Sequence, residues 1–424
     1  MNEKLLQFIW QFQYYNKNGL VTVDGSPLHI IHPGFANTNQ GPDFLEARIK
    51  TGDTEWAGNI EIHTHASHWN NHKHNGDTNY SNIILHVVWI NDTPIKDGNN
   101  QLIATLELYD LVPKIMLQQY EQLIHAKGFV PCENYLPALT AMGWLSWKER
   151  LMAERLQRKS ANVLLYLQQA GNHWEEVFWW LLARNFGMKV NAGIFEQVAK
   201  SIPVNILAKH KNQVNQLEAL LLGQAGLLSG SFMEEYPQML QREYRFLAAK
   251  FKLQPIAKKP DFLRMRPANF PTVRLAQLAM LVHCSTHLFS GVLEMENISD
   301  LRKLLDITAN DYWLYHYIFD EETACKPKNI GRLMVDNIII NTVIPVLFAY
   351  GIYHKEQRWK DKALQYAALL PAEQNAITKQ WGNKNISNEN ALDSQALLEL
   401  KNNYCDLKYC LNCAVGNKVL KAQE

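Results

Sequence analysis

The sequence lacks an excess of charge of either sign. It has 42 Lys and Arg against 41 Asp and Glu, a net charge of +1. This balance excludes a polybasic protein that coats nucleic acid by charge alone, and it also excludes an acidic solvating protein. Hydrophobic residues make up 47% and charged residues 20% of the chain, which excludes wholesale disorder.

The sequence also lacks three common motifs of enzymes. It has no G-x-x-x-x-G-K-[ST] loop, no G-x-G-x-x-G turn and no G-x-S-x-G elbow. Nucleotide hydrolysis by a P-loop, dinucleotide redox chemistry and α/β-hydrolase chemistry therefore lose support.

No apolar run is both long and free of polar residues. The longest, from Leu333 to Tyr350, contains Asp336, Asn337, Asn341 and Pro345, which predicts a buried core helix with a kink at the proline. The first 20 residues carry three glutamines and no small-residue cleavage site, so they predict an amphipathic helix rather than a signal peptide. We expect a cytoplasmic protein without a membrane, whose six cysteines are reduced.

The balanced total charge conceals an uneven distribution. Residues 1–110 hold 6 Lys and Arg, 12 Asp and Glu, and 8 of the 15 histidines. Residues 111–424 hold 36 Lys and Arg against 29 Asp and Glu. The chain is therefore acidic and His-rich at its start and mildly basic afterwards.

The pattern of apolar residues changes at the same place. Residues 20–110 predict strands, which we place at 21–23, 28–31, 47–49, 59–64, 82–90 and 102–108. Helical periodicity dominates beyond residue 110, for example at 147–169, 174–186, 192–202, 214–228 and 235–251, with 252–270 as a linker or a surface arm. We predict an α/β module with a mixed sheet over 1–110 and a large all-α region over 111–424.

The densest chemistry lies between residues 41 and 86. Pro42-Asp43 precedes Glu61-Ile62-His63, in which Glu61 and His63 are two apart and share one face of a strand. A hairpin would bring Asp43 beside Glu61. Two carboxylates and the carbonyl of Ile62 make an oxygen-rich site suited to Mg²⁺ or Mn²⁺.

Histidines are concentrated in the same stretch. The candidates for acid/base catalysis or metal binding are His63, His65, His68, His72, His74 and His86. Their spacing is not that of a structural zinc site. The alternative is a polar loop after a strand, and this alternative is strongest for His72 and His74.

The arrangement Pro42-Asp43…Glu61-x-His63 resembles the PD-(D/E)XK signature of restriction-endonuclease-like nucleases. The resemblance implies a restriction-endonuclease-like fold in which Asp43 and Glu61 bind the metal. His63 stands where the superfamily has the lysine that assists the nucleophilic water. The segment from His63 to His74 is similar to the Trp- and His-rich segment of very-short-patch repair endonucleases, a branch of the same fold that uses histidines near this strand.

Nearly the whole chain also resembles a bacterial family, the domain of unknown function 2851. The resemblance rests on residues 39–44, 58–63, 84–88, 266–271 and 341–345 and on the C-terminal cysteine segment. It implies membership of that family and no particular activity.

Three of the six cysteines form a C-terminal cluster, C-x4-C-x2-C, at Cys405, Cys410 and Cys413. Such spacing suits Zn²⁺ or an iron–sulfur cluster if a fourth ligand is present, and Cys132 is the candidate. Some PD-(D/E)XK nucleases join their ends in a similar way, with one distant and three C-terminal cysteines. The alternative is a set of reduced cysteines packed in the core.

Two basic segments are candidates for contact with phosphates. Arg264, Arg266 and Arg274 surround a predicted helix start, where they either bind nucleic acid or pair between helices. Lys148, Arg150, Arg155, Arg158 and Lys159 make a basic helix whose interleaved glutamates also suit a salt-bridged face.

Three functions are consistent with these features. The first is a metal-dependent nuclease, a hydrolase of DNA or RNA, with Asp43 and Glu61 as metal ligands and His63 as acid/base. The second is a catalytically inactive module that binds nucleic acid or a protein. The third is a metallohydrolase whose ligands are histidines among His63, His65, His68 and His86.

Overall fold

The computed structural model describes residues 1–72, 77–98, 100–263, 265–285 and 287–421. The chain forms two compact units, which we call the sheet unit (residues 1–144 and 400–424) and the helical unit (residues 145–399). The expected division at residue 110 falls after the last strand. The chain up to residue 144 and the C-terminal segment nevertheless belong with the sheet.

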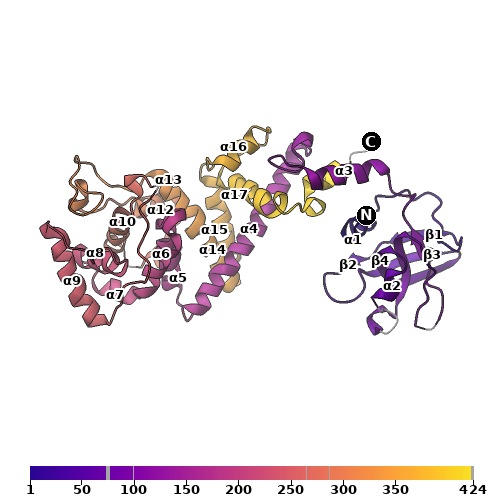
Figure 1. Ribbon diagram of the computed structural model, residues 1–424, viewed down its shortest axis with the longest axis horizontal. Helices are drawn as coiled ribbons and strands as arrows, with labels where there is room; N and C mark the ends of the chain where they lie inside the picture. Colours follow the sequence, from indigo (N-terminus) through magenta and orange to yellow (C-terminus); the bar gives the residue numbers. More distant parts are fainter. Residues whose placement is uncertain (73–76, 99, 264, 286, 422–424) are drawn as a thin grey trace. The chain divides into compact units, whose positions relative to one another are not determined.

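The sheet unit contains a mixed sheet. Its elements are α1 (Glu3–Gln11), β1 (Leu28–His32), β2 (Phe35–Ala36), β3 (Phe44–Thr51), β4 (Thr54–His65), α2 (His68–Asn71), β5 (Ile83–Ile90), β6 (Thr105–Glu107), α3 (Lys114–His125) and α18 (Ala414–Lys421). The strand order is β1-β3-β4-β5-β6, with β2 paired to β3. Figure 1 labels β1 to β4 of this sheet. β3 runs antiparallel to β1 and β4, whereas β4, β5 and β6 are parallel.

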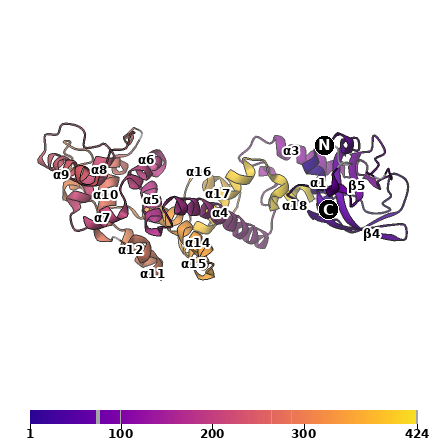
Figure 2. The same cartoon turned by 90° about the horizontal axis from the view of Figure 1, so that it is seen from below.

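The C-terminal segment packs within the sheet unit. Tyr14 donates a hydrogen bond from its hydroxyl to Oδ1 of Asn417 over 2.7 Å, and Nζ of Lys408 donates to the carbonyl of Ala126 over 2.6 Å. Both figures show this segment beside α3 (Figures 1 and 2). The chain therefore returns to the sheet unit after the helical unit, which the sequence pattern does not indicate.

The second half of β4, which carries Glu61, is buried on both faces. Its alternation of polar and apolar residues predicts a half-buried strand. Ile60 and Ile62 are fully buried on one face, but Glu61 and His63 on the other are 5% and 0% exposed. The polar face is covered because α2 packs on β4 and inserts Trp69, which is 1% exposed. The prediction of a strand at 21–23 is wrong, because Val21 makes only an isolated bridge to Pro27.

The regular elements of the helical unit are helices, joined by loops in which the described residues form only isolated β-bridges. They are α4 (Ala141–Gln169, which begins in the sheet unit), α5 (Trp174–Phe186), α6 (Met188–Ser201), α7 (Val204–Lys209), α8 (Val214–Gln224), α9 (Glu235–Phe251), α10 (Pro271–Cys284), α11 (Leu288–Glu294), α12 (Ile298–Leu305), α13 (Arg332–Ile338), α14 (Ile344–Tyr353), α15 (Gln357–Leu369), α16 (Ala376–Gly382) and α17 (Ala391–Glu399). A mixed sheet followed by a large helical region confirms the predicted fold class.

The apolar segment 333–350 lies within one long helix. Arg332–Tyr353 has a mean hydropathy of 1.7, and 67% of its most apolar stretch is buried. Among the described residues it is the one helix that is by itself long and apolar enough to cross a membrane, which is weak evidence for a span. The irregularity predicted at Pro345 begins earlier, as a π-helical turn at Ile339–Val343.

The basic residues of α4 are mostly paired. Arg155 and Arg158 both bind Glu399, at 3.0 and 2.6 Å, and Lys148 lies 2.8 Å from Asp393. These contacts favour the interpretation of a salt-bridged face. They leave Lys159 as the exception, because its Nζ donates to the neutral amide of Asn341.

Candidate functional site

The hairpin of β3 and β4 brings Asp43 and Glu61 together. Phe44 pairs with Ile60, so Asp43, one residue before β3, lies opposite Glu61. The backbone N–H of Asp43 donates to Oε2 of Glu61 over 3.2 Å, and the N–H of Ile62 donates to Oδ2 of Asp43 over 3.0 Å. Each carboxylate is therefore held by the strand that carries the other.

The first helix completes the surroundings of the two carboxylates. Nε2 of Gln7 on α1 donates to Oδ1 of Asp43 over 2.8 Å. Burial, with a smaller contribution from the charge of Glu3, raises the pKa of Asp43 to about 7. Burial followed by repulsion from Asp43 raises the pKa of Glu61 to about 9. Burial and mutual repulsion thus disfavour the ionised form of this pair, and a bound cation would restore it by offsetting the negative charge.

His63 lies beside this pair. Its Nε2 is 3.6 Å from Oε1 of Glu61 and 3.1 Å from Nδ1 of His72. Its Nδ1 is 2.9 Å from Nε2 of His86, which is fully buried on β5 opposite Glu61. Three imidazoles therefore form a chain from a buried to an exposed position, which is an arrangement suited to moving a proton.

The remaining histidines are less closely involved. His68 contacts Oγ1 of Thr64 at 3.4 Å, and its ring centroid is 6.2 Å from that of His63. His65 packs on His68 with ring centroids 5.3 Å apart. His74 lies outside the described residues. The sequence favours a polar loop without a functional role for His72. In the structure, however, Nδ1 of His72 contacts His63.

Other residues near the carboxylates gave only indirect signals in the sequence. Gln7 belongs to the predicted N-terminal helix whose glutamines argue against a signal peptide, and no motif in the sequence marks Tyr80. Burial, followed by repulsion from Glu61 and Asp43, raises the pKa of Tyr80 to about 12. The tyrosine therefore remains protonated and uncharged near neutral pH.

The donor atoms fit an oxygen-preferring cation such as Mg²⁺ or Mn²⁺ better than Zn²⁺ or another metal that prefers imidazole and thiolate. No group of three or more His, Cys, Asp or Glu side chains is arranged to hold a metal ion in the part of the chain that the structure describes. Two carboxylates can still bind Mg²⁺ or Mn²⁺ together with a backbone carbonyl and water, because these ions keep several water ligands. A site made mainly of imidazoles has less support, since both ring nitrogens of His63 already contact other histidines.

The structure brings Cys132 to the C-terminal cysteines. All four cysteines are 6–8% exposed. Burial and the neighbouring Cys413 and Cys410 raise the pKa of Cys132 to about 12, and burial followed by Cys413 raises the pKa of Cys410 to about 11. Burial also raises the pKa of Cys405, with Cys413 and Cys132 as the next causes. The four sulfurs therefore share one buried region of the sheet unit.

One cysteine of the four lies beside backbone donors. Burial raises the pKa of the Cys413 thiol, and the N–H groups of Gly416 and Val415 at the start of α18 offset part of that rise. Cys284 and Cys325 are exposed and lie outside this group.

The three predicted arginines do not form a single exposed patch. Arg266 is exposed, whereas Arg274 on α10 is 7% exposed and lines a cavity. Arg264 lies outside the described residues. The sequence pattern could not distinguish these environments because all three arginines lie within eleven positions around a helix start.

These features define a protein with a mixed sheet and a large helical region, in which two neighbouring strands place the half-buried Asp43 beside the buried Glu61 and His63. The chain belongs to the family described as protein of unknown function, DUF2851, whose model matches residues 3–376. No curated protein and no solved structure gave a significant match.

Proposed function

We propose that the sheet unit is a metal-dependent phosphodiesterase that cleaves nucleic acid, either DNA or RNA. The observation that carries the proposal is the convergence of Asp43, Glu61 and His63, which are 18 and two residues apart in sequence. The supporting resemblance is to PD-(D/E)XK nucleases. The cytoplasm, where nucleic acid is present and thiols are reduced, is the proposed location.

The residues divide the work of hydrolysis. Asp43 and Glu61 would hold Mg²⁺ or Mn²⁺, which when bound polarises the phosphoryl group and acidifies a water molecule. His63 takes the place of the lysine and accepts a proton from the attacking water. His86 fixes the ring of His63 through the 2.9 Å contact, and His72 passes the proton towards solvent.

Plasmid and single-stranded DNA and RNA, incubated with Mg²⁺ or Mn²⁺, test this proposal. The wild type should cleave at least one substrate, and Asp43→Asn should lower the rate by about a hundredfold or more. Glu55→Gln on the exposed part of β4 is the matched control and should cleave normally. If the wild type and Asp43→Asn give the same background cleavage with every metal and substrate, the nuclease proposal is wrong.

The same reagents separate the alternatives. A salt-dependent gel shift that survives Asp43→Ala, without cleavage, would indicate an inactive module that binds nucleic acid. A histidine-ligated metallohydrolase would give a different result. Its activity would depend on Zn²⁺, and His86→Ala would abolish that activity whereas Asp43→Asn would not.

We also propose that Cys132, Cys405, Cys410 and Cys413 hold Zn²⁺ or an iron–sulfur cluster that ties the C-terminal segment to the sheet unit. The side chains would have to reorient on binding, because no three of them are arranged to hold a metal ion in the described residues. The support is their common burial and the N–H groups around Cys413. Protein purified without oxygen should contain about one equivalent of zinc or an iron-dependent visible absorbance. Cys413→Ser should lose it and Cys284→Ser should keep it. Less than about a tenth of an equivalent in the wild type would end this idea.

A further inference from the structure

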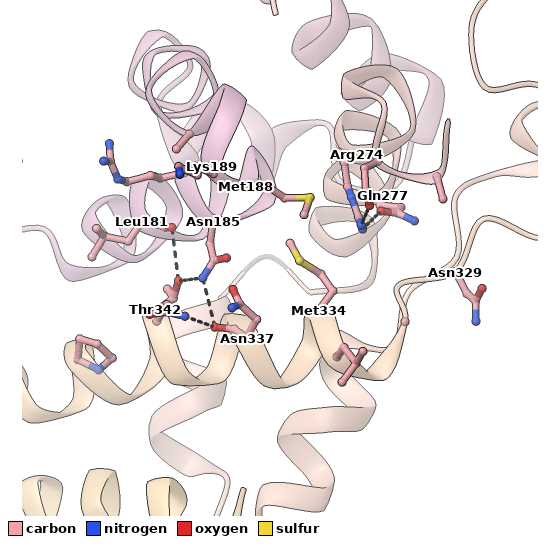
Figure 3. Close-up of a pocket in the computed structure, with 18 of the residues that line it drawn as sticks. Leu181, Asn185, Met188, Lys189, Arg274, Gln277, Asn329, Met334, Asn337 and Thr342 are labelled. Atoms are coloured by element: carbon pink, nitrogen blue, oxygen red, sulfur yellow. Dashed lines mark hydrogen bonds between the residues drawn. The ribbon is translucent and has the colours of Figure 1, made fainter. Parts of the chain in front are cut away.

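The helical unit contains a large cavity that the proposed nuclease chemistry does not use. Its volume is about 1290 Å³, and its described lining residues lie between Lys159 and Pro345, all in the helical unit. The walls come from α4, α5, α6, α10, α13 and the π-helical turn Ile339–Val343 (Figure 3). The volume exceeds the ~300–1,000 Å³ of typical ligand pockets, so a ligand of nucleotide size fits with water.

The lining is cationic. Six Lys or Arg and no Asp or Glu occur among the described lining residues, the cations being Lys159, Arg184, Lys189, Arg274, Lys326 and Lys328. A cavity with charges of one sign and walls of low dielectric attracts the opposite charge. The lining therefore suits an anion.

Arg274 is the lining cation that a bound anion would stabilise most. It is 7% exposed, and among the described residues its guanidinium donates to two neutral groups only, Oε1 of Gln277 at 2.9 Å and Oδ1 of Asn269 at 2.6 Å. Its buried Nε has no hydrogen-bond partner among the described residues, and burial lowers the pKa of Arg274 to about 10. A buried charge held by neutral partners is costly, and a phosphate would offset that cost through charge-assisted hydrogen bonds.

Two lysines have similar surroundings. Nζ of Lys159 donates to Oδ1 of Asn341 over 2.8 Å, and burial followed by the charge of Arg155 lowers the pKa of Lys159 to about 7. Lys328 is 5% exposed and donates to the carbonyls of Leu314 and Lys326. Arg184 differs because it is paired with Glu196 at 2.5 Å. The cations with neutral partners come from three different parts of the chain.

The opposite wall is lined with neutral hydrogen-bonding groups. Nδ2 of Asn185 donates to Oγ1 of Thr342 at 3.2 Å and to the carbonyl of Asn337 at 3.4 Å. Met188 and Met334 extend into the space between these groups and Arg274 (Figure 3). Amides match the donor and acceptor edges of a heterocyclic base, and methionines adapt to a flat ring.

We propose that this cavity binds a phosphorylated nucleoside, with its phosphate at Arg274 and its base between the methionines and the amides of Asn185 and Asn337. The same chemistry is present in a free nucleotide and in the phosphorylated end of a strand. The inference does not depend on the proposed nuclease, because every residue it uses lies in the helical unit.

Calorimetric titration of the full chain tests the proposal with five probes: ATP, AMP, adenosine, pyrophosphate and a 5′-phosphorylated hexanucleotide. At about 50 mM salt, AMP or ATP should bind with a Kd below about 100 μM, and adenosine and pyrophosphate should each bind about tenfold more weakly or worse. Tighter binding of the hexanucleotide than of AMP would support the site with a strand end as its occupant.

Substitutions connect binding to the cavity. Arg274→Gln should weaken binding by about tenfold or more, with unchanged thermal unfolding showing that the chain is folded. Lys326→Glu, at an exposed lining position, should weaken it by about threefold without affecting the core. Lys379→Glu on α16 is exposed and outside the lining, and it should have no effect.

Three results would overturn the proposal. The first is no binding of any phosphorylated probe at about 1 mM. The second is equal affinity for pyrophosphate and ATP, which would remove the role of the base. The third is equal weakening by Lys326→Glu and Lys379→Glu, which would indicate attraction by overall charge.

Discussion

The backbone N–H of Asp43 donates to the side chain of Glu61, while the N–H that follows Glu61 in the chain, that of Ile62, donates to the side chain of Asp43. This reciprocal pair fixes both carboxylates to the sheet before any ligand arrives. The arrangement costs free energy, because both groups are raised in pKa by burial and Glu61 also by Asp43. Such cost is expected where carboxylates serve binding rather than stability.

A divalent cation should therefore stabilise the protein. Mn²⁺ or Mg²⁺ at about ten times its Kd should add about 1.4 kcal/mol to the free energy of unfolding, measured as a rise in Tm. Asp43→Asn should remove the rise because it deletes one charged ligand. Glu55→Gln, which changes an exposed carboxylate of the same strand, should retain it. A rise of equal size in Asp43→Asn would place the cation elsewhere.

His63 should be needed for catalysis and not for metal binding. His63→Ala should lower the rate of cleavage by about 10²–10⁴-fold while the Mn²⁺-dependent rise in Tm persists. His86→Ala should have a smaller effect and should alter the pH–rate profile, because His86 positions the ring of His63. His29→Ala on β1 is exposed and should behave as the wild type. Normal cleavage by His63→Ala would assign the acid/base role to another group.

The division into sheet and helices could be predicted because apolar periodicity changes from two to 3.6 near residue 110. α5 and α9 begin and end at the predicted residues. The return of residues 400–424 to the sheet unit could not be predicted. It depends on long-range contacts such as that of Tyr14 with Asn417, and amphipathic periodicity contains no information about which partner a helix covers.

The candidate site was predictable where chemistry and spacing coincided. Asp43, Glu61 and His63 converge because two strands joined by a short turn must align their residues in register. The contact of His72 with His63 depends on how α2 folds back over β4, and no local pattern specifies that path. The cavity in the helical unit could not be predicted from the sequence either. The polar pair Asn337 and Asn341 in an otherwise apolar helix was its one indication, because both residues line the cavity.

Gly416→Ala should destabilise the sheet unit. A Cβ at Gly416 would lie 2.2 Å from the carbonyl oxygen of Cys410, so α18 would have to move away from the cysteine segment. We expect the free energy of unfolding, measured with a denaturant, to fall by about 1–3 kcal/mol, together with loss of any metal at the cysteines.

Gly193→Ala within α6 is the matched control for Gly416→Ala. Its Cβ would meet nothing within 4 Å, and it should stabilise by up to about 1 kcal/mol. Equal effects of the two substitutions would contradict the close approach.

Glu218 on α8 should make the helical unit less stable as pH rises. It is 0% exposed and accepts hydrogen bonds from Nε1 of Trp313 at 3.0 Å and from the hydroxyl of Tyr236 at 2.9 Å. Burial nevertheless raises the pKa of Glu218 to about 7, above the ordinary value of 4.5. The folded state therefore binds more protons than the unfolded state between these two pH values, and stability falls as pH rises through this window.

The loss between pH 5 and pH 8 can reach about 3 kcal/mol for one fully buried carboxyl group. Glu218→Gln removes the titration, so its free energy of unfolding should change less over this range than that of the wild type. Glu235→Gln, on exposed α9, should keep the wild-type slope. Urea unfolding at several pH values gives these slopes directly. Parallel curves for the wild type and Glu218→Gln would mean that Glu218 is ionised in the folded protein, held so by its hydrogen-bond donors despite its burial.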